Sequence, residues 1–283
     1  MYLIPTLITL QLLTSSSSMP SLVDRNLPSL KNGDPEPPLP FGRPRVYVMR
    51  FCPYAQRTLI YLAKKRILTQ VINLNLIDKP GWYFEKNPKG NVPTFEMDGK
   101  IVYESLIIPE YLDSIFPESA ILPKESYVYA RQRMLVEQLN VMTEVVSKLF
   151  QSLKHNKTKE ECVSAIEYAE AKLDECERLA VNNDPFFAGQ KPGFPDYMIF
   201  SFFERLWIYL TRVIVHVRPE LSPYVSKYTE HEFPGNSIWP KLTKWFAVML
   251  ELDEIIESRQ PREALIAYTK TSIAGKPDYD FGI

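Results

Sequence analysis

Short apolar runs alternate with a helical pattern in the first half of the chain. Arg45 to Met49 is β-prone and apolar, which predicts a buried strand. Tyr54 to Arg66 places Leu59 and Leu62 at helical spacing and predicts a helix. A second strand is expected near Thr69–Asn75. These runs together predict a βαβ unit.

A hairpin and a helix are expected to follow. Asp98-Gly99 separates the apolar runs 92–97 and 100–103, and Asp-Gly between apolar runs is a strong hairpin signal. A helix is expected from about Ser105 to Ile115, ended by Pro117. The order βαβ–ββα predicts an α/β, thioredoxin-like domain with a mixed four-stranded sheet.

Beyond residue 125 the pattern is helical only. Thr158 and Glu161 form a capping-box pattern that opens one helix, and further helices are expected at about 196–215 and 240–258. Two apolar stripes run at helical spacing: Leu135, Leu139, Met142, Val146, Leu149, Leu153, and then Cys162, Ile166, Ala169, Leu173, Cys176, Ala180. The two cysteines of the second stripe are therefore expected to be core residues.

The first 44 residues do not read as a folded domain. Residues 1–18 resemble a poor signal peptide without a basic start and are expected to be a leader or disordered segment, with Met19 a possible second start. Residues 19–44 are rich in proline and predict an extended arm. The expected organisation is therefore a leader and arm at 1–44, a thioredoxin-like domain at 45–118 and an all-α domain at 125–283.

Composition excludes several classes of function. The 283 residues carry a formal net charge of −1, which gives no basic field for nucleic acid. Three cysteines are too few for a disulfide framework, and no Cys/His group has zinc spacing, so no metal is expected. No segment is long enough to span a membrane. A cytoplasmic, reducing compartment is the expected location.

Cys52 is the strongest candidate for chemistry. It precedes Pro53 at the junction of a predicted strand and helix, where proline is tolerated at the first helical position. Cys52 is thus the expected N-cap, facing free N–H groups and the positive end of the helix dipole. Both effects favour the thiolate, which predicts a lowered pKa and a nucleophilic sulfur. The alternative is a small buried core cysteine.

Six short motifs follow one another along the chain: Arg50-Phe51-Cys52-Pro53-Tyr54-Ala55, Asp78-Lys79-Pro80, Asn87-Pro88-Lys89-Gly90-Asn91-Val92-Pro93, Tyr103-Glu104-Ser105, Phe203-Glu204-Arg205-Leu206 and Lys244-Trp245. Each motif is weak alone and specific in combination. In their order and spacing they resemble the omega class of glutathione transferases. The resemblance covers about residues 35–283.

The resemblance implies a glutathione site. Val92-Pro93 is a candidate cis peptide that would turn the Val92 main chain toward an extended peptide. Glu104 and Ser105, expected to begin a helix, suit the ammonium and carboxylate of the γ-glutamyl end. Lys79 suits the glycyl carboxylate, although a solvated loop lysine is an equal alternative.

A second-substrate pocket is also implied by the resemblance. Tyr54 is expected to pack over the glutathione site or to be core. Arg205 and Trp245 would line the pocket, with a surface salt bridge and helix–helix packing as their respective alternatives. One departure concerns the helix near Asp196, where the family's Ser/Thr-x-x-Asp cap has Gly193 instead.

The implied activity is glutathione-dependent thiol transfer and dehydroascorbate reduction through a Cys52–glutathione mixed disulfide. Ala55 takes the place of a resolving cysteine, which predicts a monothiol cycle. Glutathione is then the co-substrate, and the second substrate is a small electrophile, a disulfide or dehydroascorbate. A homodimer is expected from the family alone.

Three alternatives stay open at this point. Some insect members of the class make a pteridine eye-pigment precursor. The chloride intracellular channel family shares the fold and a Cys-Pro motif. A non-catalytic ligand carrier would bind hydrophobic molecules without needing Cys52.

Overall fold

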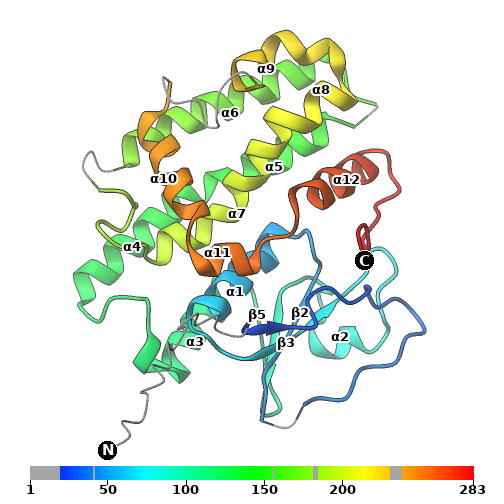
Figure 1. Ribbon diagram of the computed structural model, residues 1–283, viewed down its shortest axis with the longest axis vertical. Coiled ribbons are helices and arrows are strands. Elements are labelled where there is room, and N and C mark those ends of the chain that lie inside the picture. The colour runs from blue at the N-terminus through cyan, green and yellow to red at the C-terminus, as the bar shows by residue number, and fades with distance from the viewer. Residues whose placement is uncertain (1–19, 41, 155, 181–183, 230–237) are drawn as a thin grey trace, which may run out of the picture.

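The computed structural model describes residues 20–40, 42–154, 156–180, 184–229 and 238–283. The expected leader at 1–18 lies outside these residues. The chain forms an N-terminal half built on a sheet and a larger C-terminal half of helices that lies against it (Figure 1). This arrangement confirms the predicted fold class.

The sheet is mixed and has five strands in the order β1-β3-β2-β4-β5. β3 (Thr69–Asn73) runs parallel to β2 (Arg45–Val48), and β4 (Thr94–Met97) and β5 (Lys100–Tyr103) are antiparallel. The sequence predicted four strands. The fifth is β1 (Leu22–Val23), two residues of the arm that pair with β3. A two-residue strand within a proline-rich segment leaves too little pattern to predict.

The local signals in this half are largely confirmed. Asp98 and Gly99 have φ values of 50° and 72°, as a two-residue hairpin turn requires. The peptide between Val92 and Pro93 is cis. The remaining elements are α1 (Pro53–Lys64), α2 (Tyr83–Lys86) and α3 (Ile107–Ile115).

The helical half contains more breaks than the apolar stripes predicted. The first stripe is divided at Asn140 and the segment 240–258 at Glu251–Leu252. A turn of π-helix at Tyr209–Val213 interrupts another predicted helix. The described helices are α4 (Ser126–Leu139), α5 (Val141–Ser152), α6 (Lys159–Leu179), α7 (Phe194–Ile208), α8 (Ile214–Val217), α9 (Ser222–Thr229), α10 (Pro240–Leu250), α11 (Asp253–Ser258) and α12 (Arg262–Ile273).

The capping box of α6 forms as predicted. The Glu161 N–H donates to Thr158 Oγ1 at 3.1 Å, and the Thr158 N–H donates to Glu161 Oε2 at 2.8 Å. Cys162 and Cys176 on this helix are fully buried, which confirms that both are core residues.

Helix α7 is capped without a side chain at its N-cap, Gly193. The Asp196 carboxylate accepts the Gly193 N–H at 2.9 Å, and Gln132 of α4 accepts the Phe194 N–H at 3.3 Å. A Cβ at position 193 would lie 2.6 Å from the Ala188 Cβ. Close packing therefore excludes the family's Ser or Thr here, and Gln132 supplies an acceptor from another helix.

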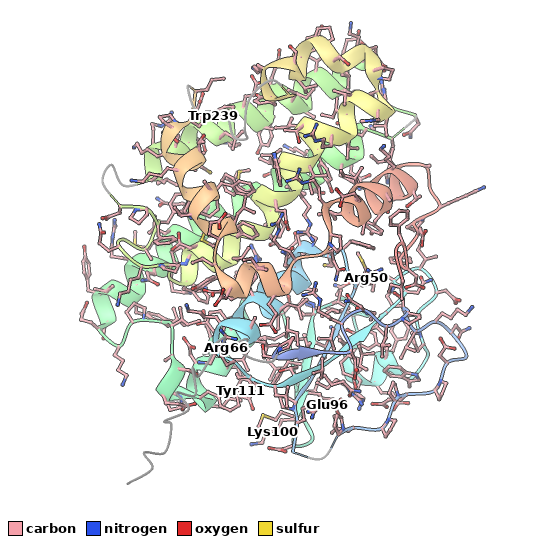
Figure 2. All side chains as sticks on the ribbon, in the orientation of Figure 1. Arg50, Arg66, Glu96, Lys100, Tyr111 and Trp239 are labelled. Carbon is pink, nitrogen blue, oxygen red and sulfur yellow. The ribbon has the colours of Figure 1, made fainter. Side chains whose placement is uncertain are left out.

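The two halves share buried contacts. Helix α1 packs against α7 and α11. At the other end of the chain, the final residues return to the sheet half, where Arg50 donates to the carbonyls of Tyr279 at 3.4 Å and Phe281 at 3.1 Å (Figure 2). No helix within the described ranges is long and apolar enough to cross a bilayer.

Candidate functional site

Cys52 occupies the junction that the sequence predicted. It is the N-cap of α1, with extended backbone angles and Pro53 in the first turn, and its carbonyl accepts the Gln56 N–H at 3.0 Å. The side chain is 8% exposed and opens onto two neighbouring hollows.

The predicted lowering of the Cys52 pKa is wrong. Burial raises the pKa of the Cys52 thiol and outweighs the opposing effects of the backbone N–H groups of Tyr54 and Ala55 and of the positive charges on Arg205 and Arg57. The N-cap position does favour the thiolate, but the sulfur makes no regular capping hydrogen bond. Desolvation therefore determines the direction in which the Cys52 pKa shifts.

We expect the pH profile of Cys52 alkylation by iodoacetamide to have its midpoint above the ordinary cysteine value of about 8.5, because burial disfavours the thiolate. Mass spectrometry of the alkylated peptide measures this site alone. The fully buried Cys162 and Cys176 serve as internal references that should stay unmodified. A midpoint near 6 would show that the helix terminus dominates over burial.

The first hollow is a cleft of about 330 Å³ in the sheet half, at the start of α1. It brings together all predicted glutathione-binding residues except Lys79. Its lining includes Cys52, Tyr54, Val92, Pro93, Glu104 and Ser105. Predicted residues from three separate stretches of sequence thus meet at one concave surface.

Glu104 and Ser105 form one wall of the cleft with a geometry that the sequence did not predict. Glu104 has a φ of 81°, and its carbonyl accepts the N–H groups of Ile107 and Ile108, both at 3.0 Å. Helix α3 therefore begins at Ile107 rather than Ser105. The Glu104 carboxylate is half-exposed and paired with Lys89 at 2.8 Å.

Ser105 accepts a hydrogen bond from Arg57, a residue that the sequence did not predict as part of the site. Arg57 of α1 is 2% exposed, and its Nη1 donates to Ser105 Oγ at 3.2 Å. The available signal was an arginine among the buried positions of an apolar helix, between Ala55 and Leu59.

Lys79 lies beside the cleft rather than in its lining. Its Nζ donates to the carbonyl of Leu76 at 2.6 Å and lies 6.0 Å from the centre of the Phe84 ring. Leu76 itself lines the cleft. The Lys79 ammonium thus contacts a residue of the cleft lining but does not itself line the cleft, where it was expected.

The second hollow is a pocket of about 270 Å³ on the other side of Cys52, between the two halves. Arg205 lines it, buried, with Nη2 donating to the Phe51 carbonyl at 3.0 Å and Nη1 paired with Glu204 at 2.8 Å. An exposed salt bridge for Arg205 is therefore wrong. The pocket wall is otherwise strongly aromatic: Phe51, Tyr54, Phe150, Phe202, Tyr209 and Tyr268.

Trp245, expected in the same pocket, lies in the core of the helical half. It is 2% exposed, packs edge-on against Phe187 and Phe203, and donates its indole N–H to Asp196 at 2.9 Å. These contacts match the packing alternative, so of the two residues predicted for this pocket, Arg205 lines it and Trp245 does not. Tyr54 is 42% exposed and borders both hollows.

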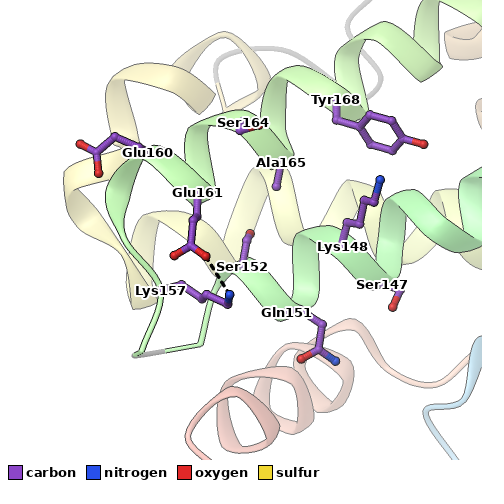
Figure 3. A pocket seen from close by; sticks show the side chains of 10 residues that line it. All are labelled: Ser147, Lys148, Gln151, Ser152, Lys157, Glu160, Glu161, Ser164, Ala165 and Tyr168. Carbon is purple, nitrogen blue, oxygen red and sulfur yellow. Dashed lines mark hydrogen bonds and ion pairs between the residues drawn. The ribbon is translucent and has the colours of Figure 1, made fainter.

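A larger groove of about 620 Å³ lies between α5 and α6 and does not include Cys52 (Figure 3). Most residues that line it are polar or charged, with Lys157 paired to Glu161 at 2.8 Å and Lys148 beside Tyr168. Ser147 borders both this groove and the aromatic pocket. The chemistry of the candidate site stays with the two hollows that share Cys52.

The chain is similar to known proteins over most of its length. Residues 46–120 match the family model "Glutathione S-transferase, N-terminal domain". A Caenorhabditis briggsae protein named "Probable glutathione transferase omega-2" is 40% identical over 270 residues, covering 94% of this chain and all of the relative. "Glutathione transferase omega-1" of Caenorhabditis elegans is 38% identical, covering 90% of this chain and 96% of the relative.

Solved structures agree on the fold. A Tau class glutathione S-transferase from mango superposes with a TM-score of 0.66 at 20% identity, covering 81% of this chain and 97% of that one. Glutathione transferase Omega 3C from Trametes versicolor superposes with a TM-score of 0.61 at 22% identity, covering 84% and 94%.

Proposed function

The chain belongs to the omega class of glutathione transferases, and from this membership we propose that it catalyses glutathione-dependent thiol transfer and dehydroascorbate reduction through Cys52. The observation that carries the proposal is a cysteine, rather than a hydroxyl residue, at the helix start between a polar cleft and an aromatic pocket. A thiolate there can form and break disulfides, which a hydroxyl cannot.

In the proposed cycle, the Cys52 thiolate attacks the glutathione sulfur of a mixed disulfide. A Cys52–glutathione disulfide forms, and the other thiol leaves and takes a proton. A second glutathione thiolate then attacks the bound glutathione sulfur, releasing glutathione disulfide and the Cys52 thiolate. With dehydroascorbate, two glutathione molecules supply the two electrons and two protons that make ascorbate. The cycle suits a reducing compartment such as the cytoplasm.

We assign the ends of glutathione by charge. Glu104 and Ser105 would hold the γ-glutamyl ammonium and carboxylate, and the Val92 main chain would pair with the cysteinyl residue. Lys79 would turn from Leu76 to the glycyl carboxylate. The aromatic pocket, with Arg205 at its wall, would take a flat or anionic second substrate. The family also leads us to expect a homodimer.

The proposal is tested on the wild-type protein by intact mass and turnover. Incubation with glutathione disulfide is expected to add one glutathionyl group to each chain and release one glutathione, with the group mapping to Cys52, because the other two cysteines are fully buried. Dehydroascorbate should be reduced with glutathione as the electron source. Turnover without any adduct, or an adduct on Cys162 or Cys176, would contradict the cycle.

A further inference from the structure

Arg57 is a buried cation whose partners come from both halves of the protein. Nε donates to the Met198 carbonyl of α7 at 2.5 Å, and Nη2 donates to Asn140 Oδ1, between α4 and α5, at 3.0 Å. Nη1 donates to Ser105 Oγ at 3.2 Å. All three acceptors are neutral.

This charge lacks the carboxylate partner that two other buried arginines, Arg205 and Arg45, have. Arg205 pairs with Glu204 at 2.8 Å, and Arg45 lies 3.5 Å from Glu36. Burial lowers the pKa of Arg57 to about 10, which leaves the guanidinium protonated at neutral pH. A buried charge held only by neutral groups is costly, so an anion nearby would be stabilised strongly.

Two anion positions lie beside Arg57. Ser105 accepts a hydrogen bond from the guanidinium, so its own hydroxyl proton is free to donate toward the cleft that Ser105 lines. Cys52 is the N-cap of the same helix, five residues before Arg57, and the charges of Arg57 and Cys52 act on one another.

We propose that Arg57 is a positioning residue of the glutathione site. Fixed by the helical half, its guanidinium aims the Ser105 hydroxyl at the γ-glutamyl carboxylate and supplies the positive charge that this carboxylate and the Cys52 thiolate share. This inference rests on the proposed function, because it assumes that glutathione occupies the cleft. If Arg57 has this role, the affinity of the cleft for glutathione depends on the contacts of Arg57 with Met198 and Asn140 in the helical half.

The test pairs a change in Arg57 with a change in the ligand. Calorimetry would compare S-methylglutathione with its analogue lacking the γ-glutamyl α-carboxylate, on the wild type and on Arg57→Gln. Loss of the carboxylate should weaken binding to the wild type by about 10- to 100-fold, as for a hydrogen bond to a charged group. In Arg57→Gln, S-methylglutathione itself should bind about as weakly, and removing the carboxylate should cost little more.

A second readout follows the thiol. Arg57→Gln should move the midpoint of Cys52 alkylation upward from the wild-type value by about one pH unit, a tenfold effect on the thiolate population. Arg57→Lys keeps a charge but cannot reach three acceptors, so it should hold that midpoint while losing glutathione affinity. A purely structural role would move neither the midpoint nor the coupling to the carboxylate.

Arg45→Gln is the matched control, since Arg45 is also buried and contacts Gln70 and the Pro38 carbonyl instead of the cleft. Both readouts should be unchanged in it. If Arg57→Gln does not fold, Arg57→Lys with the same ligand pair decides. An equal penalty for carboxylate removal in wild type and Arg57 variant overturns the inference. Neither readout requires turnover, so absent thiol transfer would reject the proposed function alone.

Discussion

Replacing Cys52 with alanine is expected to lower glutathione-dependent reduction of hydroxyethyl disulfide and of dehydroascorbate by ~10³-fold or more, as removal of a nucleophile does. No other cysteine can substitute, because Cys162 and Cys176 are fully buried in α6. The measurement is kcat/KM for both substrates at several glutathione concentrations.

Binding separates this loss from unfolding. The cleft is lined by several residues besides Cys52, so Cys52→Ala should still bind S-methylglutathione within about tenfold of the wild type. Cys176→Ala is the control for removing a thiol and should keep wild-type turnover. Substantial turnover by Cys52→Ala would reject the mixed-disulfide cycle and favour a site that uses glutathione's own thiolate.

Asp196→Asn is expected to lower the free energy of unfolding by about 3 kcal/mol, a large effect for one substitution. Each carboxylate oxygen accepts two N–H groups: Oδ1 from Phe187 at 2.8 Å and the Trp245 indole at 2.9 Å, and Oδ2 from Ala188 at 3.2 Å and Gly193 at 2.9 Å. An asparagine amide turns one of these acceptors into a donor. Two buried N–H groups then face an N–H group.

Urea unfolding followed by tryptophan fluorescence would measure the effect. Asp253→Asn is the control, since Asp253 also lies in the first turn of a helix but its side chain is 82% exposed. It should cost less than about 1 kcal/mol. Equal effects at the two positions would mean that Asp196 acts only through the helix dipole.

The sequence predicted the parts of this protein that depend on local chemistry. The βαβ–ββα order, the Asp98-Gly99 turn and Cys52 as N-cap each follow from a few neighbouring residues. The membership of Val92, Glu104 and Ser105 in one cleft followed from the family resemblance, because topology brings together segments that no spacing rule connects.

What the sequence could not predict depends on distant contacts. Trp245 has a residue type common to pockets and cores alike, and its packing against Phe187 and Phe203 and its bond to Asp196 decide between them. Arg57 has acceptors 48, 83 and 141 residues away. The direction of the Cys52 pKa failed for the same reason: the helix terminus is local, while the burial that outweighs it comes from the assembled fold.

The return of the last residues to Arg50 has a consequence for synthesis on the ribosome. Arg50 lies 229 residues before Tyr279 and 231 before Phe281, whose carbonyls it binds. At a rate of about 5 to 20 residues per second, this gap lasts roughly 10 to 50 s. During that time the nascent sheet half lacks the two carbonyl acceptors of Arg50. The segment that leads into Cys52 gains these hydrogen bonds only after the last residues have been made.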